Sequence, residues 1–126
     1  MRSLNRVTIS RAALIHNFSL CQQLAGGAAI LPLVKADAYG HGLIDCARLF
    51  AEQGAAAFGV AEVVEGIRLR QAGITQPVLV LAGVIPQTLE ALVEADLTPV
   101  LVDASLVAVL SRVAAQQGKV IDVHLK

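Results

Sequence analysis

The sequence predicts an α/β protein with a parallel sheet. Short apolar runs that are typical of strands recur along the 126 residues, a helical pattern separates each run from the next, and the runs start roughly 20 to 27 residues apart. That distance is what a strand, a short loop and a crossover helix require. The five predicted strands are 30–34, 57–61, 78–81, 98–102 and 120–125.

Helices are predicted before and between these strands. Ser10 can cap a helix that runs to about residue 25, and Asp103 is a candidate cap for the last helix. Pro86 suits the first turn of a helix, where its missing N–H is not needed. The remaining helices are expected over residues 43–53, 62–72 and 104–117, and a glycine follows each of them.

The composition describes an aliphatic interior. Hydrophobic residues make up 56% of the chain, aromatic residues 3% and charged residues 16%. The length allows one domain at most. Ten basic residues balance ten acidic ones and no basic stripe is present, so we expect no nucleic-acid partner.

Neither a metal site nor a membrane segment is expected. Cys21 and Cys46 lie in predicted helices without ligand spacing, and neither His16 nor His124 has a ligand partner nearby in the sequence. Polar residues interrupt the N-terminal region, which argues against a signal peptide or a membrane span. Together with the unpaired cysteines, this predicts a cytoplasmic protein.

The strand 30–34 ends in a lysine, which opens a polar turn containing Gly40 and Gly42. A lysine at a strand end can present a reactive amine, because partial burial lowers the pKa of the amine and favours Schiff-base chemistry. On composition alone, a surface lysine with an extended side chain is the commoner interpretation. The glycines permit the backbone to approach a ligand closely.

The string Lys-Ala-Asp-Ala-Tyr-Gly-His-Gly, residues 35–42, resembles the cofactor-lysine motif of the alanine racemases, which are fold-type III pyridoxal phosphate enzymes. The pattern of strands and helices alone fits either an open doubly wound sheet or a (β/α)8 barrel. The resemblance favours the barrel. It implies an α/β fold that is the N-terminal portion of a PLP-dependent (β/α)8 TIM-like barrel, with about five βα strands in residues 1–126.

The resemblance also implies roles for four residues. Lys35 would hold pyridoxal 5'-phosphate as a Schiff base and act as one of two catalytic bases. Tyr39 would donate a hydrogen bond to the cofactor phosphate, and Leu81 would pack beside the cofactor ring. Lys126 matches a lysine that is often carbamylated in the family, although a frayed charged terminus is the simpler interpretation.

Two other residues of the motif receive non-catalytic interpretations. Asp37 stands where asparagine is commoner in the family, and we do not expect it to contact phosphate. His41 is expected to be a structural hydrogen-bonding residue rather than a catalytic one.

The resemblance implies that the longer parent protein is a homodimer that interconverts L-alanine and D-alanine. This reaction supplies D-alanine for peptidoglycan. The second base, in the family a tyrosine of the other subunit, and most phosphate ligands would lie outside this chain. The isolated chain is therefore expected to be inactive or weakly active. Residues 7–9 match a segment that pairs with the family's C-terminal β domain. The open sheet is expected to be completed by further chain, by a partner or by aggregation.

Three alternatives remain open from the sequence. The chain could be a non-catalytic fragment that binds pyridoxal phosphate or serves in assembly. It could also belong to a related barrel, either an amino-acid decarboxylase or a small pyridoxal phosphate carrier. The choice between alanine and a bulkier substrate such as serine depends on groups outside the chain.

Overall fold

A parallel four-stranded sheet, in the order β1-β2-β3-β4, lies at the centre of the computed structural model, which describes residues 5–126. Each strand pairs in parallel with the next along the chain, as expected when a helix connects successive strands. This confirms the predicted α/β class. The strands are β1 (Phe58–Val60), β2 (Val78–Val80), β3 (Thr98–Leu101) and β4 (His124–Leu125).

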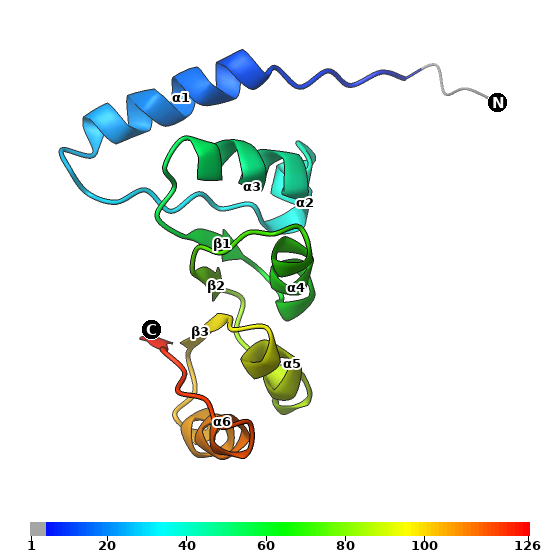
Figure 1. The fold of residues 1–126 in the computed structure, drawn as a ribbon, viewed down its shortest axis with the longest axis vertical. Coiled ribbons are helices and arrows are strands. Elements are labelled where there is room, and N and C mark those ends of the chain that lie inside the picture. Colours follow the sequence, from blue (N-terminus) through cyan, green and yellow to red (C-terminus); the bar gives the residue numbers. More distant parts are fainter. Residues whose placement is uncertain (1–4) are drawn as a thin grey trace.

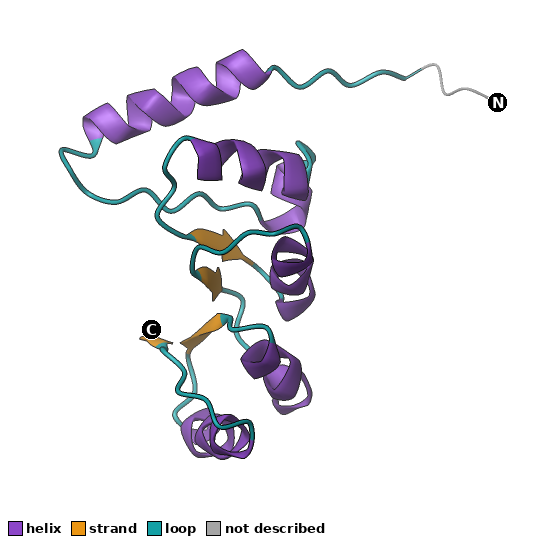
Figure 2. Cartoon of the chain, in the orientation of Figure 1, coloured by secondary structure: helices purple, strands orange, loops and turns teal. Residues whose placement is uncertain are grey.

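The longer helices gather on one side of this sheet (Figure 1). Helices α3, α4, α5 and α6 follow one another around the outside of the curving sheet, and α1 crosses above α3 (Figures 1 and 2). The sheet's other face receives no helix from the described residues. The helices are α1 (Arg11–Leu24), α2 (Lys35–Tyr39), α3 (Leu43–Glu52), α4 (Val63–Gln71), α5 (Leu89–Glu94), which follows the 3₁₀ turn η1 (Pro86–Thr88), and α6 (Ser105–Gln116).

Local signals in the sequence explain where several helices begin. The hydroxyl of Ser10 accepts a hydrogen bond from the Ala13 N–H at 3.2 Å, which confirms Ser10 as the cap of α1. The carboxylate of Asp103 accepts from the Ser105 N–H at 2.8 Å, so it serves the start of α6 although Ala104 is the capping residue. Pro86 opens η1, as its missing N–H permits.

The core lies between the sheet and the helices. Alternate residues of the strands, Phe58 and Val60 in β1 and Val78 and Val80 in β2, have no exposed surface. Because side chains alternate along a strand, the residues between them face the other side of the sheet, where Leu33 remains 45% exposed. The two faces therefore have different environments.

The predicted strand 30–34 is the main difference from the expected fold. It makes only an isolated parallel bridge, Leu33 with Gly59, so the structure contains four strands and one bridge rather than five strands. Pro32 explains this, because it has no N–H to donate to β1. Its carbonyl nevertheless accepts from the Gly59 N–H, and the Val34 N–H donates to the Gly59 carbonyl, both at 2.9 Å. The segment thus runs beside β1 as predicted.

Further differences are the short element α2, which forms where a polar turn is expected, and the ends of other elements. Of the predicted strand 120–125, only His124 and Leu125 pair with β3, and Val120 is 96% exposed. Residues 7–9 form no strand here, and Val7 is 81% exposed. No helix in residues 5–126 is long and apolar enough to cross a membrane.

Candidate functional site

The strand-end lysine lies at the carboxyl-terminal edge of the parallel sheet. The bridge to Gly59 fixes the segment that carries it, and its neighbour Val34 is fully buried. In parallel βα proteins this edge is where ligands bind, because the loops that follow the strands meet there. The side chain of Lys35 is half-buried.

A cavity of about 300 Å³ brings together three of the four predicted site residues. Lys35, Leu81 and Lys126 all line it, although they are far apart in the sequence. Its remaining walls are apolar and come from Ala61, Ala82 and Val100. The fourth residue, Tyr39, is not among the lining residues and is 63% exposed.

The turn after Lys35 is left-handed. Ala36, Asp37 and Ala38 have φ angles of 50°, 56° and 52° with ψ between 40° and 50°, and Tyr39 has a φ of 54°. A left-handed conformation costs an L-residue other than glycine about 1–2 kcal/mol. The sequence predicted a turn here, but not four consecutive non-glycine residues with positive φ. Such a turn persists only where the surrounding structure holds it.

Hydrogen bonds within the turn provide part of that support. The Ala38 N–H donates to the Val34 carbonyl at 2.8 Å, and the carbonyl of Asp37 accepts from the N–H groups of Gly40 and Gly42 at 3.1 and 2.9 Å. The Asp37 carboxylate accepts from the Leu43 N–H at 2.9 Å, at the start of α3. A carboxylate at a helix N-terminus satisfies an otherwise unpaired N–H and interacts favourably with the helix dipole.

Asp37 therefore has a structural partner of its own. Its short polar side chain also belongs to the types that tolerate the left-handed region best. In the same segment the Nδ1 of His41 lies 3.0 Å from the Ala38 carbonyl, which accepts its hydrogen bond. This contact confirms the interpretation of His41 as a structural hydrogen-bonding residue.

Glu65, on α4, is a residue that the sequence analysis missed. One of its carboxylate oxygens accepts from the Ala36 N–H at 2.6 Å, and the other accepts from the N–H groups of Ala61 and Glu62 at 2.7 and 3.1 Å. A signal was available, because a glutamate three residues after the capping residue of a helix commonly reaches back to the first N–H groups. No local pattern predicts that Glu65 also reaches the Lys35 turn, because Ala36 lies 29 residues away.

A buried thiol, that of Cys46, contacts the end of the motif segment 35–42. The Sγ of Cys46 donates a hydrogen bond to the His41 carbonyl at 3.7 Å, and Cys46 is 3% exposed. Burial, and then the nearby charges of Asp45 and Asp37, raise the pKa of this thiol above its ordinary value. Cys46 is therefore a core residue and not a reactive nucleophile.

The cavity offers an amine, apolar walls and a second amine, and these features suit part of pyridoxal phosphate. Lys35 can form the covalent link, and Leu81, Ala61 and Val100 can pack against an aromatic ring. Tyr39 is a candidate donor to the phosphate from the adjacent turn. Among residues 5–126 no cluster of His, Cys, Asp and Glu is placed to hold a metal ion.

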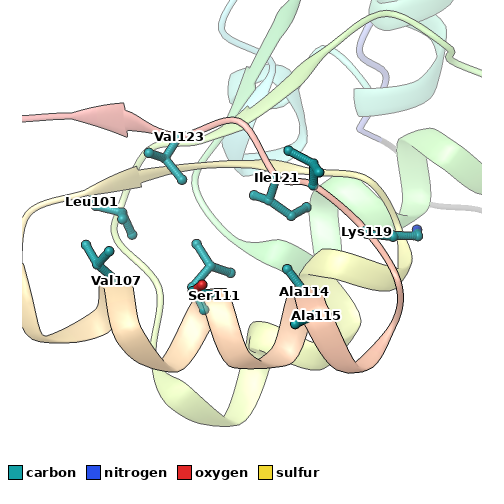
Figure 3. Close-up of a pocket in the computed structure, with 10 residues that line it drawn as sticks. Leu101, Val107, Ser111, Ala114, Ala115, Lys119, Ile121 and Val123 are labelled. Carbon is teal, nitrogen blue, oxygen red and sulfur yellow. The ribbon is translucent and has the colours of Figure 1, made fainter.

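A second cavity, of about 360 Å³, lies between α6 and the chain leading to β4 (Figure 3). Val107, Ser111 and Ala114 of α6 face Ile121 and Val123 across it. Of its lining residues only Lys119 is ionisable, and this amine donates to the carbonyls of Val93 and Glu94 and to Asp96. The second cavity thus offers no free reactive group.

Comparisons with known proteins agree on one family. The family model described as "Alanine racemase, N-terminal domain" matches residues 9–126. An alanine racemase from Synechocystis sp. is 39% identical over 122 residues, which are 95% of this chain and 33% of that protein. The chain thus spans about a third of the length of the curated relatives that it matches.

Solved structures show the same similarity. Alanine racemase from Streptomyces coelicolor A3(2) superposes with a TM-score of 0.85 at 31% identity, over 91% of this chain and 31% of that one. Histidine racemase from Leuconostoc mesenteroides superposes with a TM-score of 0.83 at 28% identity, over the same shares of the two chains. The fold described above therefore occurs in racemases named for two different amino acids.

Proposed function

Because the chain belongs to the alanine racemase N-terminal domain family, we propose that it provides the cofactor-lysine part of a pyridoxal phosphate-dependent isomerase that interconverts L-alanine and D-alanine. The observation that carries the proposal is the cavity shared by Lys35, Leu81 and Lys126 at the carboxyl edge of the sheet. Residues separated by up to 91 positions meet there.

In the proposed mechanism Lys35 has two tasks. Its ε-amine binds pyridoxal phosphate, which when bound supplies the electron sink for the charge left on the substrate's α-carbon. The same amine would also remove or return the α-proton, as one of two bases. Lys35 lines the cavity itself, which favours this role. An amine that is already held beside the reacting carbon reacts faster than one that must diffuse to it.

The other site residues are proposed to bind and orient. Leu81 packs beside the cofactor ring and, with Val100, excludes water from it. Tyr39 would donate a hydrogen bond from its phenolic O–H to the phosphate. Lys126 is proposed as the lysine that is carbamylated in the family, and its position in the cavity with Lys35 supports that assignment.

The second base and most phosphate ligands are proposed to lie in sequence beyond residues 1–126, which we regard as part of the barrel domain. The chain alone should then bind cofactor but racemise alanine slowly or not at all. We also propose a homodimeric parent protein in the cytoplasm that supplies D-alanine for the cell wall. The free cysteines, Cys21 and Cys46, suit a reducing compartment.

A racemase for another amino acid is the second candidate. The similarity to a histidine racemase supports it, because that protein shares the fold of this chain at 28% identity. Comparing alanine, serine and histidine as substrates of the longer parent protein distinguishes the two candidates.

The first experiment is to treat the chain with pyridoxal phosphate, make the lysine link irreversible with borohydride and map the adduct by peptide mass spectrometry. The chain contains three lysines, and Lys119, which lies outside the cavity of Lys35 and Lys126, is the internal control. Modification concentrated at Lys35, and lost in Lys35→Arg, supports the proposal. Equal modification of all three lysines, or none, contradicts it.

A further inference from the structure

The carboxylate of Glu65 joins three parts of the site. It accepts the Ala36 N–H from the left-handed turn at 2.6 Å, the Ala61 N–H from the end of β1 at 2.7 Å and the Glu62 N–H from the start of α4 at 3.1 Å. Ala36 directly follows Lys35, and Ala61 lines the same cavity as Lys35. One side chain therefore connects the residue next to the lysine with a wall of its cavity.

The contact with Ala36 is made where the backbone needs support. Ala36 is the first left-handed residue of the turn, with φ 50° and ψ 50°, and alanine has no side-chain polar group to stabilise that conformation. Its N–H donates to Glu65, which lies outside the turn. The two Glu65 oxygens are divided between Ala36 on one side and α4 on the other, so both ends of the carboxylate are held.

We infer that Glu65 is a positioning residue for Lys35, which sets the direction of the lysine by holding the left-handed turn to α4 and the end of β1. This rests on the proposed function, in which Lys35 binds the cofactor. Glu65 does not line the cavity, and its carboxylate contacts the backbone N–H groups of Ala36 and Ala61, so it acts through the backbone on either side of Lys35's cavity. Its charge matters because two anionic oxygens can accept three N–H donors.

A plain helix cap is the alternative role. A cap would need only the contacts to Ala61 and Glu62, and an aspartate can supply those at the first turn of a helix. Glu65→Asp separates the two roles, because it keeps the charge near α4 but is one methylene too short to bridge to Ala36 as well. Glu65→Gln keeps the length but places an NH₂ group where one oxygen now accepts.

Two measurements on the chain test the inference. The first is the hydrogen-exchange protection of the Ala36 amide without cofactor, followed by NMR. The second is the rate at which pyridoxal phosphate and borohydride label Lys35. Glu90→Gln is the matched control. Glu90 is also an acidic residue in the first turn of a helix, but that helix is α5, which follows β2 along the chain and is separate from the Lys35 turn.

We expect Glu65→Asp to unfold at nearly the wild-type temperature, to lose protection at Ala36 and to label Lys35 about 10- to 100-fold more slowly. Glu65→Gln should behave in the same way, and Glu90→Gln should match the wild type in both measurements. Should Glu65→Gln fail to fold, Glu65→Asp carries the test. Wild-type labelling and wild-type Ala36 protection in folded Glu65→Asp would overturn the inference.

The inference and the proposed function fail in different ways. A wild-type chain that is not labelled at Lys35 contradicts the proposed function. The exchange of the Ala36 amide needs no cofactor, so it still decides whether Glu65 holds the turn.

Discussion

The side chain of Leu33 occupies the space that a β-carbon on Gly59 would need. The two residues lie opposite each other in the parallel bridge that joins segment 30–34 to β1. A β-carbon at Gly59 would also lie 2.9 Å from Leu81 Cδ1 and 3.2 Å from Leu31 Cδ2. Gly59 therefore lets three leucines meet over the sheet face that carries Lys35, and one of them, Leu81, lines the cavity.

Gly59→Ala should lower the free energy of unfolding by about 1–3 kcal/mol, because the leucine side chains must move aside. Urea unfolding followed by circular dichroism measures this. The double variant Gly59→Ala/Leu33→Ala should recover much of the loss, since removing Leu33 makes room and Leu33 is already 45% exposed. Losses that simply add in the double variant would show that crowding by Leu33 is not the cause.

Asp37→Ala should lower the free energy of unfolding by about 1 kcal/mol or slightly more, since the Leu43 N–H at the start of α3 loses its acceptor. Asp37→Asn should retain most of the stability, because asparagine both caps helices and tolerates the left-handed region. The control is Asp45→Ala in the first turn of the same helix. Thermal unfolding of the three variants should rank Asp37→Ala as the least stable, and an equal effect of Asp45→Ala would contradict the capping role.

Arg70 joins the end of α4 to two separate loops. Its guanidinium donates to the carbonyls of Ile74 and Gln76 at 2.8 and 2.7 Å and to those of Ala95 and Asp96 at 3.1 and 2.9 Å. Burial lowers the pKa of Arg70, which still stays protonated at neutral pH. Four carbonyls on two segments therefore depend on one cation.

Arg70→Met should lower the free energy of unfolding by about 2–3 kcal/mol, because four carbonyls, three of them in part-buried hydrogen bonds, lose their donors. Arg70→Lys should recover only part of this, since one ammonium cannot reach both loops in the same way. Arg68→Met, an exposed change in the same last turn of α4, is the control and should cost far less. Equal midpoints for Arg68→Met and Arg70→Met in urea would contradict this structural role.

The buried thiol of Cys46 predicts a pH dependence of stability. Its pKa is raised in the folded chain, so the unfolded chain loses this proton first as the pH rises through about 8.5. Above that pH the unfolded state binds fewer protons than the folded state, and the free energy of unfolding falls. Below it the contribution is fully present.

Cys46→Ala should therefore weaken the decline in stability between about pH 8 and pH 10 relative to the wild type, whereas Cys21→Ala, at an exposed position, should leave it unchanged. Unfolding midpoints across this range measure the effect. In the folded wild type, iodoacetamide should modify Cys21 much faster than Cys46. A Cys46 that reacts as fast as Cys21 would show that the thiol is neither buried nor held protonated.

Much of the fold followed from local patterns. The apolar runs at β1, β2 and β3 predicted parallel strands, because strands of parallel sheets are buried and therefore rich in apolar residues. The structure buries side chains of these runs under the helices. Ser10 predicted the start of α1 because its hydroxyl can reach an N–H three residues away. The string around Lys35 pointed to the alanine racemase family, to which the chain belongs. Each of these signals depends on neighbours in the sequence, so it can be read without coordinates.

The rest depended on contacts between distant segments. No local signal predicts that Ala36 to Tyr39 are left-handed, because their intrinsic preference is right-handed and partners such as Glu65 lie about 30 residues away. The meeting of Lys35, Leu81 and Lys126 in one cavity likewise follows from the parallel order of the strands, which brings their carboxyl ends to one edge. The sequence by itself determined most of the elements and the family, and the packing of strands and helices decided the geometry around Lys35.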